Sequence, residues 1–247
     1  MKNAAELNVA TDIQASMLPC IFPAFPEKEE FTIHATMKPA KEVGGDFYDF
    51  FLVDDDRLAL IVADVSGKGV PAALFMVIAK TLIKNASQLG LSPKEILHKV
   101  NEQLCENNEA EMFVTVWLGI LDLRTHKMTC SNAGHEYPAI KRKGGSYELY
   151  KDKHGFVLAG FKGSQYTEYE LELHPGDSLF AYSDGVPEAT NSKDELYGTD
   201  RMLNALNQKS DFTPEESIVF VKEDIDNFIQ SAPQFDDITM LCIEIKP

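Results

Sequence analysis

Apolar residues recur along the chain with two different periods, which predict helices and strands. Spacings of three or four residues predict helices at 6–18, 71–89, 92–104, 199–207 and 214–230. Alternating or continuous apolar runs bounded by turn residues predict strands at 31–37, 47–53, 58–65, 113–123, 127–132, 137–142, 146–150, 166–173, 178–183 and 238–245. This order of elements is that of an α+β protein, with two sheets and helices outside them.

Local signals mark where several helices begin and end. Pro71 suits the first turn of a helix, and Ser92 followed by Glu95 forms a capping-box pattern. Pro19 ends the leading helix, and an extended connection with two further prolines follows it. The strand at 58–65 is apolar on both faces, so we expect it in the middle of a sheet.

The leading helix carries a short apolar stripe made of Ala10, Ile13 and Met17. So few turns fit equally well a helix that covers the core and the end of a longer coiled-coil linker. We expect this stripe to pack against the helix after Pro71 or the helix after Ser92, and to mediate dimerisation. Residues 1–26 are therefore assigned to a linker or regulatory helix with its connection, and residues 27–247 to one domain.

The composition is that of a globular protein with an acidic surface. The 39 acidic and 23 basic residues give a net charge of −16, which disfavours nucleic acid and anionic membranes as partners. The four cysteines lack CxxC spacing and no signal-like leader precedes them, so we expect a cytoplasmic location. The longest apolar run, 58–63, is far shorter than the roughly 20 residues of a membrane helix, so no membrane insertion is expected.

Four aspartates stand beside apolar strands and turns: Asp46, Asp64, Asp184 and Asp236. Asp64 follows a strongly apolar run, where an unpaired carboxylate is costly. The order of apolar strand, aspartate, glycine and proline recurs at Asp184. Taken alone, Asp46 also fits a solvated acid in a glycine turn, and Asp236 fits an Asx turn.

Gathered in one place, these acids would require cations. Two carboxylates 4 Å apart repel by about 4 kcal/mol at an effective dielectric constant of 20. The candidate ligands are oxygen atoms, without an HxxxH pair or a cysteine set, which favours Mg²⁺ or Mn²⁺ over zinc. Two such ions bridged by a carboxylate activate water and hold a phosphoryl oxygen. The pattern therefore favours hydrolysis of phosphate esters without a covalent enzyme intermediate.

Other chemistries fit the sequence less well. Residues 66–69 contain two glycines and a lysine but lack the GxxxxGK[ST] spacing of a phosphate-binding loop. Neither a GxSxG motif nor a convincing cysteine nucleophile is present. His135 lies in a predicted hairpin turn, where a structural role is more common than one as a general acid.

At these residues the chain resembles the metal-dependent protein phosphatases of the type 2C superfamily, in the bacterial branch typified by SpoIIE and RsbU. The matching segments, in order and spacing, are 42–49, 62–71, 132–138, 182–188 and 236–239. The resemblance implies a central antiparallel β-sandwich flanked by helices on both sides, with residues 27–247 as a metal-dependent phosphatase domain. It also implies two Mn²⁺ or Mg²⁺ ions.

The resemblance further implies which atoms hold the ions. Asp64 would bridge both ions, Asp46 and the main-chain carbonyl of Val65 would complete one, and Asp184 with Asp236 would hold the other. Asp237 is the second choice of ligand after its neighbour. The eukaryotic relatives grip phosphate with an arginine near the first acidic motif, where this chain has only lysines.

The implied activity is that of a protein serine/threonine phosphatase acting on phosphoserine or phosphothreonine. The implied substrate is a small protein, typically an anti-sigma factor antagonist in a partner-switching pathway. In this family an upstream sensor is often joined through a helical linker, and residues 4–18 look like the end of one. A second copy of the chain is a further expected partner. The alternatives are a weakly catalytic binding or sensor module, and a metal phosphoesterase acting on small phosphates.

Overall fold

The computed structural model describes residues 2–246, with side chains from Glu6 onwards. The chain forms two compact units. The first unit comprises Met1–Pro19, Lys41–His135 and Asp152–Glu172, and the second comprises Cys20–Ala40, Glu136–Lys151 and Leu173–Pro247. Each unit contains one five-stranded antiparallel sheet.

The first unit is built on a sheet whose central strands are strongly apolar. Its strands, in spatial order, are β2 (Phe47–Leu52), β3 (Arg57–Val65), β4 (Val114–Asp122), β5 (Lys127–Ala133) and β8 (Tyr169–Glu172). Residues 58–63 of β3 are at most 1% exposed, and β2 and β4 flank the strand on its two edges. The predicted central strand is therefore confirmed.

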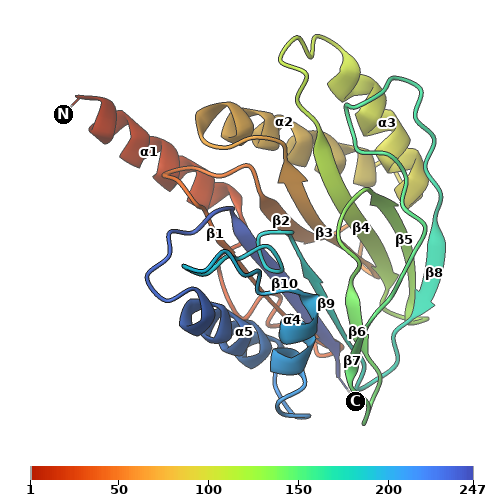
Figure 1. Ribbon diagram of the computed structural model, residues 1–247. Helices are drawn as coiled ribbons and strands as arrows, with labels where there is room; N and C mark the ends of the chain where they lie inside the picture. The colour runs from red at the N-terminus through yellow and green to blue at the C-terminus, as the bar shows by residue number, and fades with distance from the viewer. Residues whose placement is uncertain (1, 247) are drawn as a thin grey trace. The chain divides into compact units, whose positions relative to one another are not determined.

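Helices α2 (Val70–Ser87) and α3 (Pro93–Cys105) cover one face of this sheet (Figure 1). Pro71 lies in the first turn of α2, and the backbone N–H of Ser92 donates to Glu95 Oε2 at 2.8 Å. Both predicted helix starts are thus confirmed. By length and composition alone α2 could cross a membrane, but it packs against β2, β3 and α3, as a helix that covers a core does.

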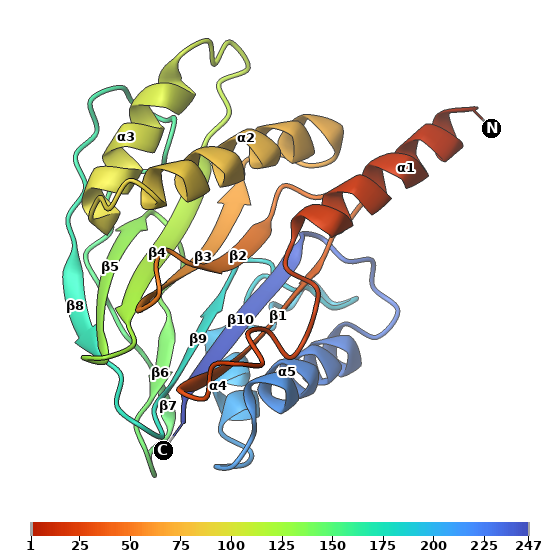
Figure 2. The same cartoon turned by 180° about the vertical axis from the view of Figure 1, so that it is seen from behind.

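The second unit contains the other sheet, with the order β1 (Phe31–Lys38), β10 (Ile238–Ile245), β9 (Ser178–Tyr182), β6 (Ala139–Lys141) and β7 (Tyr147–Leu149). Helix α5 (Pro214–Ile229) packs on β1 and β10, and α4 (Thr199–Leu206) packs on α5 and β7 (Figure 2). Apolar side chains from these helices and strands form its core, including Tyr182, Met202, Val221 and Met240. Two antiparallel sheets and five helices within residues 2–246 confirm the predicted α+β class.

The leading helix α1 (Lys2–Met17) is attached to the rest of the first unit by polar groups rather than by its predicted apolar stripe. Thr11 Oγ1 donates to the carbonyl of Glu42 at 2.8 Å. The Gln14 amide bonds both the N–H and the carbonyl of Gly44, at 2.9 and 2.7 Å, and thereby satisfies backbone groups of a buried loop. Ile13 is 54% exposed, so the predicted packing of the stripe against the following helices is wrong.

A buried ion pair joins β2 to α2. Lys80 Nζ lies 2.6 Å from Asp49 Oδ2, and both side chains are largely shielded from solvent. Burial raises the pKa of the Asp49 carboxyl, and this effect exceeds the lowering by Lys80 and by the more distant Lys84. The fold therefore keeps this ion pair buried, at a cost in desolvation free energy.

Candidate metal-binding residues

The first group of predicted ligands lies in the first unit, at the end of β3. Phe47 pairs with Ala63, so the preceding Asp46 and the following Asp64 are adjacent in an antiparallel register. Asp46 is 1% exposed and Asp64 is partly exposed. We call Asp46, Asp64 and the carbonyl of Val65 the first ligand group.

A glycine makes this arrangement possible. A Cβ on Gly45 would lie 2.8 Å from the carbonyl oxygen of Val65 and 3.1 Å from the Cβ of Ala72. Only glycine lets the two backbone segments approach so closely. The loop is held from its other side by Gln14, which bonds Gly44. The paired glycines therefore set Asp46 beside the end of β3.

The second group of predicted ligands, Asp184 and Asp236, lies in the second unit where β9 ends and β10 begins. Ser183 joins these segments: its N–H donates to the carbonyl of Thr239 at 3.0 Å, and its Oγ accepts from the N–H of Thr239 at 3.1 Å. We call Asp184 and Asp236 the second ligand group.

Acidic neighbours perturb Asp184. Burial first, and then the negative charges of Glu188, Asp236 and Glu136, together raise the pKa of the Asp184 carboxyl to about 6. A divalent cation would relieve this repulsion, so the donors fit a hard cation such as Mn²⁺ or Mg²⁺. Sequence reasoning did not single out Glu188 or Glu136. The four-residue spacing between Asp184 and Glu188 was the signal that could have found Glu188. In the structure the backbone N–H of Glu188 donates to the carbonyl of Asp184 at 2.9 Å.

Asp237 has a structural environment that differs from that of its neighbour. It is 4% exposed, and its Oδ1 accepts the backbone N–H of Ala40 at 2.7 Å. Asp236 is more exposed, and its Oδ1 accepts the N–H of Asp237 at 2.9 Å. This difference supports Asp236 as the first choice of ligand.

Gly185 lets the turn after β9 pack closely on the residues before β10, because a Cβ at this position would overlap the carbonyl oxygen of Asp237. We expect Gly185→Ala to lower the free energy of unfolding by about 1–3 kcal/mol, the usual cost of overpacking. Urea unfolding would measure it. Ser192→Ala, in an exposed turn, is the control. An exposed glycine such as Gly163 would not serve, because its φ of 82° makes an alanine there strained for a different reason. Equal stability of Gly185→Ala and the wild type would contradict the required close approach.

The predicted turn around His135 is closed by an asparagine. Asn132 Oδ1 accepts the N–H of His135 at 2.7 Å, and its Nδ2 donates to the His135 carbonyl at 3.1 Å. His135 is 3% exposed, and its Nδ1 lies 2.8 Å from Thr115 Oγ1. This environment supports the structural role rather than the role of general acid.

Among the side chains described, from Glu6 to Lys246, no group of three or more His, Cys, Asp or Glu is arranged to hold an ion. The structure thus brings Asp46 beside the end of β3, and Asp184 near Asp236, each within its own unit. The sharing of two ions by all five predicted ligands stays a prediction.

Comparison with known proteins places this fold. The solved SiaA-PP2C domain of Pseudomonas aeruginosa matches it with a TM-score of 0.85 and 23% identity, over 99% of this chain and 97% of that one. RsbX, solved in complex with magnesium, matches with a TM-score of 0.66 and 16% identity, over 89% of this chain and 97% of that one. The fold is therefore that of a PP2C-type phosphatase domain.

Sequence comparison gives the family. The profile of Stage II sporulation protein E (SpoIIE) matches residues 54–246, and the chain belongs to the SpoIIE family. The phosphoserine phosphatase RsbU of Bacillus subtilis is 31% identical over 74% of this chain and 54% of RsbU. Protein IcfG of Synechocystis sp. is 29% identical over 98% of this chain and 42% of IcfG. The chain thus spans about half the length of these relatives, and the predicted resemblance is confirmed.

Proposed function

We propose that this chain is the catalytic part of a protein serine/threonine phosphatase, which hydrolyses phosphoserine or phosphothreonine with a metal-activated water. The observation that carries the proposal is the acidic environment of Asp184 in a chain of the SpoIIE family. Carboxylates that repel one another are suited to binding divalent cations. The relative RsbU is named a phosphoserine phosphatase, which supports the substrate class.

The proposed ligands are the side chains of Asp46, Asp64, Asp184 and Asp236 and the carbonyl of Val65. Two Mn²⁺ or Mg²⁺ ions, when bound, supply an ionised water at neutral pH and polarise the phosphoryl group. The presence of magnesium in the RsbX complex supports this choice of ion. Gly45 and Ser183 do not bind ions; they hold the backbone segments that carry the ligands.

The assay that tests this proposal is release of phosphate from a phosphoserine peptide by the purified chain. Activity is expected only with added Mn²⁺ or Mg²⁺, to be lost on chelation with EDTA and to return when the ion is added back. Hydrolysis of small phosphates alone would favour the phosphoesterase alternative. Tight peptide binding without phosphate release at saturating Mn²⁺ would favour the binding module. Full activity after chelation would contradict the metal mechanism.

The physiological substrate that we infer is a phosphorylated protein of the anti-sigma factor antagonist type. The inference rests on the similarity to RsbU. A cytoplasmic location is consistent with all four cysteines being free. The net charge of −16 supports a protein rather than nucleic acid as the partner.

The outer face of α1 is the proposed contact for an upstream sensor or for a second copy of the chain. Val9, Ile13 and Met17, spaced by four residues, are 57%, 54% and 38% exposed. Apolar residues at this spacing form a stripe that another helix can cover. Thr11 and Gln14, which bond Glu42 and Gly44, lie on another side of the helix, so this outer face stays exposed.

If a second copy covers this stripe, Ile13→Glu is expected to shift the purified chain from dimer to monomer. Sedimentation velocity would measure the shift. Ala15→Glu adds the same charge at another exposed position of α1 and is expected to leave the dimer intact. A monomeric wild type at high concentration would contradict the homodimer and leave the sensor as the proposed partner.

A further inference from the structure

A pocket of about 440 Å³ opens in the second unit between two chain segments. One segment is the turn 188–196, which follows Asp184, and the other is 232–235, which precedes Asp236. Its lining includes the apolar residues Leu196, Ala232, Pro233 and Phe235 and the acidic residues Glu188 and Asp194. We call it the hairpin pocket.

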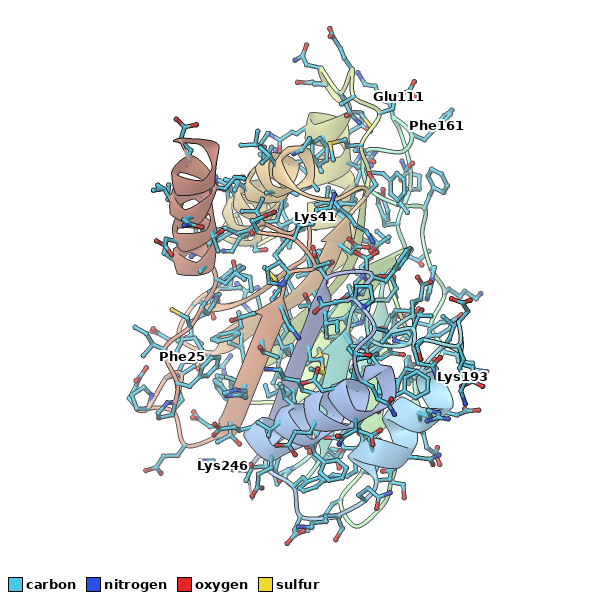
Figure 3. The ribbon with its side chains drawn as sticks, turned by 60° about the vertical axis from the view of Figure 1, so that its left-hand side comes forward. Phe25, Lys41, Glu111, Phe161, Lys193 and Lys246 are labelled. Atoms are coloured by element: carbon cyan, nitrogen blue, oxygen red, sulfur yellow. The ribbon has the colours of Figure 1, made fainter. Side chains whose placement is uncertain are left out.

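The turn that forms one wall is held by its own hydrogen bonds. Thr190 and Leu196 form an antiparallel bridge, and Asn191 Oδ1 accepts the N–H groups of Lys193 and Glu195 at 2.9 and 3.1 Å. Lys193 lies at the tip of this turn (Figure 3). The wall is therefore fixed before anything binds.

The facing wall is fixed by Gln234. Its Nε2 donates to the carbonyl of Lys38 at 2.8 Å and to the carbonyl of Asp236 at 2.7 Å. These bonds fix the segment that carries Phe235 next to Asp236, which belongs to the second ligand group. The pocket and that ligand group thus share one chain segment.

The apolar side chains of the pocket remain accessible. Leu196 is 59% exposed and Phe235 is 63% exposed. Large apolar side chains that gather at a concave site, from two separate segments, are typical of binding sites. The volume is large enough for one or two apolar side chains of a partner.

The position of the pocket relates it to the proposed reaction. Glu188 lines the pocket, and its backbone N–H donates to the carbonyl of Asp184 at 2.9 Å. Phe235 directly precedes Asp236. A substrate whose phosphate lies at the second ligand group therefore has its neighbouring residues within reach of the pocket.

The charged residues in the lining indicate which kind of peptide segment the pocket can bind. Both charged residues in its lining, Glu188 and Asp194, are acidic. They repel an acidic segment and attract a lysine or arginine next to an apolar residue. The occupant that fits is a peptide segment with one apolar and one basic side chain.

We propose that the hairpin pocket binds an apolar side chain close to the phosphorylated residue of the substrate protein, with a basic side chain at its Glu188 and Asp194 rim. Leu196, Phe235 and Asp194 then determine which phosphoproteins are hydrolysed. This inference rests on the proposed phosphatase function.

The test compares short phosphoserine peptides. In each set one position next to the phosphoserine carries leucine, lysine or serine, and the rest of the peptide is unchanged. With Mn²⁺, the wild type is expected to show a kcat/KM about tenfold higher for leucine than for serine at one position. Leu196→Ser and Phe235→Ser are each expected to bring this ratio close to one. Asp194→Asn is expected to reduce the lysine-to-serine ratio selectively, and to weaken its dependence on salt.

Ile21→Ser is the matched control, because Ile21 is 82% exposed in the same unit and does not line the pocket. It is expected to keep both ratios. Hydrolysis by the wild type with equal ratios at every position, or ratios unchanged in Leu196→Ser and Phe235→Ser, would overturn the pocket assignment alone. Absence of hydrolysis of every peptide with Mn²⁺ would overturn the phosphatase function itself.

Discussion

Asp64→Asn and Asp184→Asn are each expected to lower kcat/KM for a phosphoserine peptide by more than about a hundredfold. Replacing outer partners of metal ligands already costs about 10–100-fold, and these substitutions remove a proposed ligand charge itself. Asparagine keeps the size of the side chain, so the loss would report on charge. Phosphate release at saturating Mn²⁺ is the measurement.

Thermal unfolding distinguishes this loss from misfolding. The folded state holds the Asp184 proton more tightly than the unfolded chain, because the pKa rises from 3.8 to about 6. The contribution of this carboxyl to stability is therefore present at low pH and falls as the pH rises from about 4 to about 6. Above that range, metal-free Asp184→Asn is expected to melt at or above the wild-type temperature.

Mn²⁺ is expected to raise the melting temperature of the wild type, and to raise it less in either variant. Asp211→Asn, at an exposed position of the second unit, is the matched control and is expected to behave as the wild type does. Unchanged turnover in both Asp64→Asn and Asp184→Asn would remove the metal mechanism.

Asp49→Ala is expected to lower the free energy of unfolding by about 3–5 kcal/mol, because it leaves the Lys80 ammonium without its partner in a largely buried site. Urea unfolding monitored by circular dichroism would measure the loss. The raised pKa of Asp49 shows that burial dominates over the attraction of Lys80. The double variant Asp49→Leu, Lys80→Met is therefore expected to recover most of the stability.

An exposed pair provides the comparison for the buried one. Arg57 Nε lies 2.7 Å from Asp54 Oδ2, with both side chains more than a third exposed. Arg57→Ala, which keeps the backbone hydrogen bonds that Asp54 accepts, is expected to cost about 1 kcal/mol or less, because solvent screens such pairs. An equally small loss for Asp49→Ala would show that the buried pair is not coupled to folding.

The sequence predicted most of the elements because their signals are local. The apolar run of β3 and the capping box at Ser92 need no knowledge of distant residues. The order of the aspartate motifs also led to the correct family. The packing of the α1 stripe on the following helices was predicted wrongly, because the position of α1 depends on bonds between Gln14 and Gly44, which are 30 residues apart.

The surroundings of the proposed ligands were harder to predict for the same reason. Glu136 acts on Asp184 from a segment 48 positions earlier in the chain, and periodicity carries no information on such a contact. The hairpin pocket likewise joins the turn at 188–196 to residues 232–235. No local pattern connects Leu196 with Phe235.

The close approach of Gly45 to Val65 has a consequence for mutagenesis. The proposed ligand at position 65 is a main-chain oxygen, so a scan that exchanges the valine side chain leaves the donor atom in place. A side chain introduced at Gly45 would instead push against that oxygen at 2.8 Å. The Val65 donor can therefore be displaced by mutating Gly45, twenty positions earlier in the chain. Substitution of Gly45 would abolish activity in such a scan although this residue carries no functional group.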